Sequence, residues 1–199
     1  MKLYWCPKTR ATRALWMLHE LGVPFELVFI DIRDAKAKAD PAFRAASPMG
    51  KVPALEDGAT RLWDSGAICM YLADQYPAAG LAPAIGDPDR GRYLQWLLYT
   101  NSVIEPAMAE KFTNATPSAA AHGWGTYELM LNTLRDGLGA AGGPWILGQR
   151  FSAADIMLGT ACYFLRQFGL VKDEPVTFGY VDRCMARPAA ERATAAEMP

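Results

Sequence analysis

The sequence has few histidines, no paired cysteines and no long apolar run, and each shortage removes a class of function. The chain has two histidines in 199 residues. A Ser–His–Asp triad would have to use one of them, and a two-histidine metal centre would have to use both. The four cysteines, at positions 6, 69, 162 and 184, form neither a CxxC motif nor a zinc-ligand spacing. We therefore expect free thiols, no bound metal and no hydrolytic histidine chemistry.

An excess of charge of one sign is also lacking. Twenty basic and 21 acidic residues give a net charge of −1, without the basic stretches that nucleic acid or an anionic membrane would require. The longest apolar stretch, from Ile156 to Leu165, is shorter than the ~20 residues of a bilayer helix. The first residues show no signal-peptide pattern. We expect a cytoplasmic protein that binds small molecules and copies of itself, with no nucleic acid and no membrane partner.

The hydrophobic pattern divides the chain into two parts. In the first part, β-prone runs occur at Leu3–Cys6, Phe25–Ile30, Val52–Leu55 and Thr60–Trp63. A helical pattern between the first two runs ends at Gly22, a short helix is predicted at Ala42–Ala46, and Ser65–Tyr76 is a further predicted helix. A Glu-Asp-Gly turn joins the last two runs as a hairpin. Residues 1–77 are therefore predicted to form an α/β domain.

The second part has only helical patterns. Three prolines between residues 77 and 88 interrupt the chain, which predicts a linker at 78–86 and an all-helical domain at 87–199. The expected helices are Arg90–Phe112, Ser118–Ala141, Ser152–Phe168, Phe178–Ala186 and a short tail to Glu197. Ser152 and Asp155 stand at the two positions of a capping box, which we interpret as structural.

Five strings in this order resemble the cytosolic glutathione transferases, in particular the bacterial ones. They are MKLYWCPKTRATRALWML at the N-terminus, SPMGKVPAL at 47–55, DSGAICMYLADQYP at 64–77, WILGQRFSAADI at 145–156, and a tail with Arg183 and Arg187-Pro188. The resemblance covers nearly the whole chain. It implies an α/β thioredoxin-like N-terminal domain followed by an all-α C-terminal helical bundle, a homodimer, and glutathione as co-substrate with no other cofactor.

The resemblance also implies a glutathione site. In the family, the residue before a cis-proline pairs its backbone with the cysteinyl part of glutathione, and here these residues are Val52 and Pro53. Asp64 and Ser65 match the acidic-Ser pair that holds the γ-glutamyl group at a helix N-terminus. Either residue could instead be a simple N-cap. Two basic residues could contact the glycyl carboxylate or be ordinary surface charges: Lys51 and Arg10.

Two residues compete for the catalytic position. Several classes of the family have a serine two residues after the first proline, and here that position is Thr9, whose hydroxyl could stabilise the glutathione thiolate. Cys6, directly before the proline, also resembles the cysteine of omega-like transferases and glutaredoxins, which forms a mixed disulfide with glutathione. It could equally be a buried apolar residue that ends the first strand. Tyr4 is interpreted as strand packing.

The acceptor substrate is expected to bind between the two domains, beside the helix at 90–112. Four residues near one face of that helix are the candidates: Asn101, Ile104, Glu105 and Met108. Ile104 and Met108 could equally be interhelical core, whereas Asn101 and Glu105 are harder to explain as core.

Three functions follow from this pattern. The first is a glutathione transferase that conjugates the glutathione thiolate to a small apolar electrophile, as in detoxification. The second is a glutathione-dependent thiol transferase or reductase that uses Cys6. The third is a binding module with the same fold and no turnover, because a fold does not fix a function.

Overall fold

A computed structural model describes residues 1–113, 122–172 and 174–196. The chain divides into two compact units. The first comprises Met1–Gly80 together with the C-terminal segment from Arg187, and the second comprises Leu81–Ala186. Each unit is described by itself.

The first unit contains a four-stranded mixed sheet in the order β2-β1-β3-β4. The strands are β1 (Lys2–Trp5), β2 (Glu26–Phe29), β3 (Ala54–Asp57) and β4 (Thr60–Trp63). β1 runs parallel to β2 and antiparallel to β3, and β3 and β4 form the predicted hairpin. β3 begins two residues later than predicted, because Val52 and Pro53 form the turn that leads into it.

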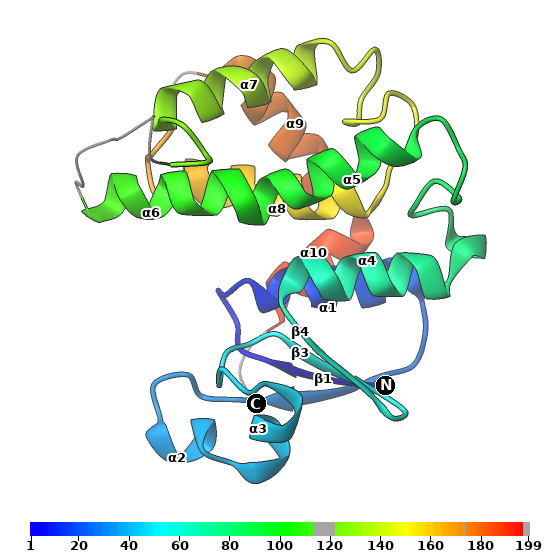
Figure 1. Ribbon diagram of the computed structural model, residues 1–199, viewed down its shortest axis with the longest axis vertical. Helices are drawn as coiled ribbons and strands as arrows, with labels where there is room; N and C mark the ends of the chain where they lie inside the picture. Colours follow the sequence, from blue (N-terminus) through cyan, green and yellow to red (C-terminus); the bar gives the residue numbers. More distant parts are fainter. Residues whose placement is uncertain (114–121, 173, 197–199) are drawn as a thin grey trace. The chain divides into compact units, whose positions relative to one another are not determined.

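Helices cover both faces of this sheet. The helix α1 (Ala11–Leu21) and the helix α4 (Ser65–Gln75) lie together on one face, and α3 (Pro41–Ala46) lies on the other (Figure 1). α1 ends as predicted, because Gly22 adopts a left-handed conformation (φ 64°) and its N–H donates to the Leu18 carbonyl. A short helix α2 (Ala35–Lys38) was not predicted; Asp34 caps it by accepting a hydrogen bond from the Lys36 N–H.

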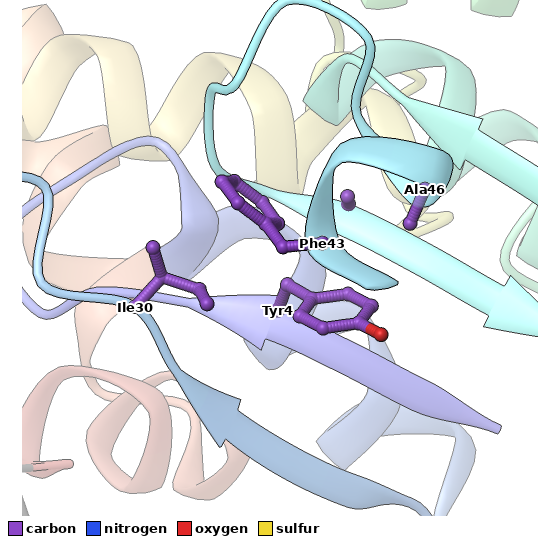
Figure 2. Packing of buried hydrophobic residues seen from close by; sticks show 5 residues of the cluster. Tyr4, Ile30, Phe43 and Ala46 are labelled. Atoms are coloured by element: carbon purple, nitrogen blue, oxygen red, sulfur yellow. The ribbon is translucent and has the colours of Figure 1, made fainter. Parts of the chain in front are cut away.

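A small hydrophobic cluster lies between the sheet and α3. It consists of Tyr4, Ile30, Phe43, Ala46 and Ala54, with Val28, Ala37 and Val52 packed against it. Figure 2 shows the Phe43 side chain of α3 above the Tyr4 ring of β1, and the two ring centroids are 5.5 Å apart. The cluster therefore joins β1, α3 and the turn that contains Val52.

The second unit is helical. Its elements are α5 (Arg90–Tyr99), the π-helical turn η2 (Thr100–Ile104), α6 (Glu105–Thr113), α7 (Tyr127–Gly139), α8 (Ala153–Gln167) and α9 (Pro175–Met185). α8 is the most buried of these helices, and the predicted capping box of Ser152 and Asp155 begins it. A short 3₁₀ turn η1 (Pro77–Ala79) precedes this unit.

Three of the predicted helices differ from the structure. The helix expected at Phe178–Ala186 begins three residues earlier, at Pro175. The helix expected at 90–112 contains a π turn, because Pro106 has no N–H to donate in the next turn and the helical hydrogen-bond pattern must shift before it. The helix expected from Ser118 begins at Tyr127, since residues 122–125 form a turn. Thr126 is the N-cap residue of this helix, and its Oγ1 accepts a hydrogen bond from the Leu129 N–H. Residues 118–121 lie outside the described part of the chain.

The C-terminal helix α10 (Pro188–Ala195) groups with the first unit, which differs from the predicted helical domain of 87–199. Its buried face consists of alanines, which allow it to pack closely against α1. Arg187 donates two hydrogen bonds to the Glu20 carboxylate of α1, at 2.6 and 2.8 Å. Glu197, in the predicted tail, lies outside the described residues. Among the described residues, no helix combines the length and the apolar character that crossing a membrane requires.

Candidate functional site

The register of the sheet brings three of the predicted site segments to one end of it. Tyr4 of β1 pairs with Ala54 of β3, and Ala54 pairs with Trp63 of β4. The residues that follow Tyr4 and Trp63, and those that precede Ala54, therefore lie at the same edge. Cys6, the Val52–Pro53 pair and Asp64 meet at this edge, which we call the turn edge of the sheet.

The first segment is the turn between β1 and α1, which contains Thr9. The Thr9 hydroxyl donates a hydrogen bond to the Cys6 carbonyl (2.7 Å) and accepts one from the Ala11 N–H (3.2 Å). Lys8, in the same turn, has a positive φ of 58°. Because a hydroxyl has a single hydrogen, Thr9 must turn that hydrogen away from Cys6 before it can donate to a ligand.

The four cysteines are free, as predicted, and all four are buried. Burial raises the pKa of Cys69 to about 12. Burial, and to a smaller extent the negative charge of Asp155, raise the pKa of Cys184 well above its usual value. These two thiols are therefore protonated at neutral pH. Cys6 is 7% exposed and lies at the turn edge, so it differs from them in position.

The second segment is the loop from Ser47 to Pro53. The Ser47 hydroxyl is buried, donates to the Lys51 carbonyl (2.7 Å) and accepts from the Lys51 N–H (3.0 Å). Gly50, with a φ of 64°, closes the turn. The peptide bond between Val52 and Pro53 is cis, which confirms the prediction. Lys51 is exposed, and Val52 packs against the hydrophobic cluster of Figure 2.

Tyr4 belongs to that cluster, as predicted for a residue that packs in the strand. Its side chain is buried and its hydroxyl donates to the Glu56 carboxylate at 3.2 Å. Burial, followed by the negative charge of Glu56, raises the pKa of Tyr4 to about 12. The tyrosine is therefore neutral at physiological pH and holds β1 to β3.

The third segment is the N-terminus of α4. Asp64 is exposed and has a φ of 77°, a conformation that costs about 1–3 kcal/mol outside glycine and is often found at binding sites. Its Oδ1 accepts hydrogen bonds from the N–H groups of Gly66 (2.8 Å) and Ala67 (3.1 Å). Asp64 is thus the N-cap, and Ser65 is the first residue of the helix.

A residue that sequence reasoning missed lies behind this segment. Arg13 of α1 is fully buried and its Nη1 donates to Ser65 Oγ at 3.3 Å. Its neighbours Ala14 and Leu15 belong to the apolar face of α1. An arginine in such a pattern normally indicates the edge of a helix face, so no sequence pattern indicated its burial. Arg10, also predicted, is exposed and is the N-cap residue of α1.

The predicted acceptor-site residues lie at the π turn and the start of α6. Ile104 and Met108 are buried, whereas Asn101 and Glu105 are partly exposed. The π turn changes the helical phase between residues 100 and 104, so spacing alone does not place all four on one face. Their contact with a substrate stays a prediction. Within the described ranges, no cluster of three potential metal ligands is present.

Comparisons with known proteins give one family. The model for the glutathione S-transferase N-terminal domain matches residues 5–75, and the model for the C-terminal domain matches residues 117–191. A sphingomonad glutathione S-transferase, solved in complex with glutathione, has a TM-score of 0.80 and 34% sequence identity. The match covers 98% of this chain and 97% of that one.

Two curated proteins match over nearly their full length. Glutathione S-transferase GstA of Escherichia coli O157:H7 is 28% identical over 206 residues, which cover 99% of this chain and 98% of that protein. The disulfide-bond oxidoreductase YfcG of Escherichia coli K12 is 26% identical over 207 residues, which cover 96% and 93%.

Proposed function

Because the chain belongs to the glutathione S-transferase family, we propose that it conjugates the thiolate of glutathione to a small apolar electrophile. The observation that carries the proposal is the turn edge, where the turn of Thr9, the Val52–Pro53 pair and the N-terminus of α4 meet. Glutathione is the co-substrate. The sphingomonad relative was solved with this tripeptide bound.

Each part of glutathione has a partner at this edge. The backbone of Val52 offers a short strand edge to the cysteinyl residue. The Ser65 hydroxyl and the N-terminus of α4 take the γ-glutamyl carboxylate, and the exposed Asp64 carboxylate attracts the α-amine. Lys51 and Arg10 are exposed cations that attract the glycyl carboxylate.

Thr9 is the proposed donor to the glutathione sulfur. Its hydroxyl turns its hydrogen from the Cys6 carbonyl to the thiolate, which lowers the pKa of the bound thiol below the ~8.5 of free cysteine. The glutathione thiol releases its proton to solvent. The thiolate then forms a C–S bond with the electrophilic carbon, and the leaving group departs with the electron pair of its former bond.

A second candidate is a thiol transferase that uses Cys6. The relative YfcG, named a disulfide-bond oxidoreductase, and the place of Cys6 at the turn edge favour it. The Cys6 thiolate attacks a glutathione mixed disulfide, and the other thiol leaves as its thiolate. A second glutathione thiolate then attacks the Cys6–glutathione disulfide and releases oxidised glutathione.

The remaining features are proposed from family membership. The electrophile is expected to contact Asn101, Ile104, Glu105 and Met108. The protein is proposed to be a cytoplasmic homodimer with a role in detoxification. A third candidate, a binding module without turnover, shares all of these features except catalysis.

Two variants separate the three candidates. Thr9→Val removes the hydroxyl at nearly constant volume, and Cys6→Ala removes the thiol. Conjugation of glutathione to an activated aryl chloride and reduction of the cysteine–glutathione mixed disulfide are measured for each, with glutathione affinity by calorimetry.

We expect Thr9→Val to lower conjugation by about 10- to 100-fold with a much smaller loss of glutathione affinity, because the lost hydrogen bond stabilises only the thiolate form of the bound thiol. Cys6→Ala should retain conjugation. Loss of disulfide reduction in Cys6→Ala, together with a mass adduct of one glutathione on Cys6 of the unmodified protein, would support the second candidate instead. Glutathione binding without either activity would leave the binding module.

A further inference from the structure

A cluster of three side chains lies at the end of α6, outside the proposed glutathione chemistry. Glu110 of α6 is buried, and its Oε2 accepts a hydrogen bond from the Trp124 indole N–H at 2.8 Å. The His122 ring is stacked on the Trp124 ring, with the centroids 4.4 Å apart and an angle of 22° between the planes, and its Nδ1 lies 3.8 Å from Glu110 Oε2. We propose that these residues form a pH-sensitive latch, in which protonation of His122 closes an ion pair with Glu110 and fixes the turn at 122–125 to α6.

The cluster has two buried atoms without a hydrogen-bond partner. In the part of the chain that the structure describes, neither Glu110 Oε1 nor His122 Nδ1 makes a hydrogen bond. The 3.8 Å between Nδ1 and the carboxylate is too long for one, and a buried carboxylate that accepts from the Trp124 indole alone is poorly satisfied. A protonated imidazole has a hydrogen on both ring nitrogens, so its Nδ1 becomes a charged donor to the carboxylate. One proton therefore supplies the missing partner of both residues.

The geometry allows the pair to close. The His122 side chain is 30% exposed and the Glu110 side chain 6% exposed, so the imidazole can exchange its proton with water and turn toward a carboxylate that the Trp124 indole holds in place. The stacked indole also favours the charged ring, because an aromatic face attracts cations. The Gly125 N–H donates to the His122 carbonyl at 2.9 Å, so the turn at 122–125 is fixed together with His122.

The other ionisable groups beside this turn lie on α6 and on the first turn of α7. Lys111 and Glu128 are exposed, so water and salt screen their opposite charges, and Lys111 Nζ lies over the Tyr127 ring, 5.3 Å from its centroid. Burial, and then the negative charge of Glu128, raise the pKa of Tyr127 to about 12, so its hydroxyl is neutral. Within the described ranges, Glu110 is therefore the charged group that lies within 4 Å of His122.

A double-mutant cycle at two pH values tests the latch. Glu110→Gln removes the charge and keeps an oxygen acceptor for the Trp124 indole, and His122→Gln removes the titrating ring. Urea unfolding of the four proteins at pH 8 and at pH 5.5 gives the coupling factor, by which the two residues together change the unfolding equilibrium constant beyond their separate effects. This interval spans the ordinary titration of an imidazole and lies above that of a carboxyl. The titration of His19 cancels, because all four proteins contain it.

We expect a coupling factor of about 10-fold or more at pH 5.5, as for a hydrogen bond between charged groups, and of about twofold or less at pH 8. The matched control is the cycle of Arg166→Gln and Asp182→Asn, because this exposed ion pair contains no histidine. Its coupling factor should be equal at the two pH values. A factor for Glu110 and His122 that rises by less than threefold from pH 8 to pH 5.5 overturns the latch.

A second measurement decides the case if Glu110→Gln fails to fold. Hydrogen exchange of the Trp124 indole N–H is followed by NMR in the unmodified protein and in His122→Gln, with the signal identified by its absence in Trp124→Phe. At pH 5.5 the unmodified protein should exchange this hydrogen at least threefold more slowly than His122→Gln, because the closed ion pair holds the carboxylate that accepts it. At pH 8 the two rates should be equal. A ratio of rates that is the same at both pH values, or reversed at pH 5.5, overturns the latch.

Discussion

At the scale of single residues, two features stand out in the turn between β1 and α1. The Thr9 hydroxyl is already hydrogen-bonded within the turn, and the backbone of Lys8 is strained. Lys8 adopts a left-handed φ of 58°, which costs a residue with a Cβ about 1–2 kcal/mol and glycine almost nothing. The turn keeps this conformation because β1 and α1, on either side of it, are both packed in the core.

The strain predicts a stabilising substitution. Relief of this strain in Lys8→Gly should raise the free energy of unfolding in urea by about 1 kcal/mol. The greater entropy of glycine in the unfolded chain offsets part of this gain. Gly22→Ala is the reverse control: Gly22 has a φ of 64° and nothing within 4 Å of an added Cβ, so it should lose about 1 kcal/mol from the backbone alone. A loss of stability in Lys8→Gly would contradict the assigned strain.

Asp155 is a buried carboxylate of the second unit that accepts several hydrogen bonds. Its carboxylate accepts hydrogen bonds from the Ile146 N–H (2.8 Å), the Tyr180 hydroxyl (2.8 Å), and the N–H (2.9 Å) and hydroxyl (3.1 Å) of Ser152. Burial raises the pKa of this carboxyl, and these hydrogen bonds oppose the rise. Such a site requires two oxygen acceptors.

Asp155→Asn should therefore destabilise the protein by about 2–4 kcal/mol. The amide replaces one acceptor with an NH₂ group, which faces another donor and leaves buried groups unsatisfied. Urea unfolding followed by circular dichroism measures the loss. Asp182→Asn is the control, because Asp182 is exposed and pairs with an exposed arginine, and it should change stability by less than about 0.5 kcal/mol.

At the scale of secondary-structure elements, we expect the packing of α1 against α10 to depend on pH through His19. Burial, and then the positive charge of Arg192, lower the pKa of His19 in the folded protein. Its ring also contacts the ring of Phe25, with the centroids 5.5 Å apart. In the unfolded chain, histidine binds its proton near pH 6.5.

The unfolded state therefore gains protons first as the pH falls below about 6.5, and stability should decrease until His19 is protonated in the folded state too. Urea unfolding at pH 8 and at pH 5.5 measures this decrease. His19→Gln should lose less stability over the same interval. An equal loss in the variant would assign the effect to other groups.

The loop before β3 predicts a coupling between stability and glutathione binding. Ser47→Ala removes both hydrogen bonds to the Lys51 backbone, so we expect a loss of about 1–3 kcal/mol and weaker glutathione binding, because Val52 follows this loop. Calorimetry and urea unfolding measure the two effects. Ser102→Ala is the control, since Ser102 is exposed on the π turn. If the Ser47→Ala variant is destabilised but binds glutathione with unchanged affinity, the loop does not contribute to glutathione binding.

Periodicity predicted the elements that have one clear face or one clear stop signal. α1 with its Gly22 stop, the β3–β4 hairpin and α8 with its capping box belong to this group. The π turn was missed because it interrupts a longer helical pattern over only a few residues and depends on the single residue Pro106. α2 was missed because its four residues contain no buried position to set a period.

The site could be predicted only in part. Val52, Asp64 and Ser65 stand in strings that a resemblance can match, and the register of the sheet places them at one edge. The burial of Arg13 and the two bonds of the Thr9 hydroxyl arise from tertiary packing and turn geometry, which no local pattern encodes.

At the scale of the whole molecule, the first unit is discontinuous in sequence, because α10 returns to α1. The return is fixed by the paired hydrogen bonds of Arg187 to Glu20, a carboxylate that also accepts from the Trp16 indole at 2.8 Å. Sequence spacing contained no sign of this contact, which joins residues 167 positions apart.

Arg187→Met should lower the free energy of unfolding of the first unit by about 1–3 kcal/mol, because it leaves a largely buried Glu20 carboxylate without its cation. Urea unfolding followed by circular dichroism measures the loss. Arg192→Met, which removes an exposed and weaker contact to the His19 carbonyl, should have a much smaller effect. Equal losses in the two variants would rule out a special role for the Glu20 pair.

Because α10 belongs to the first unit but is synthesised last, the first unit is completed after the second during translation. After the ribosome has added residue 80, it must add more than a hundred further residues before it reaches Arg187. This takes roughly 5–20 seconds at about 5–20 residues per second. By the end of that interval the second unit has all of its residues, whereas the face of α1 that α10 later covers is still open. The nascent first unit is therefore the part that a chaperone would be expected to hold until translation reaches the last helix.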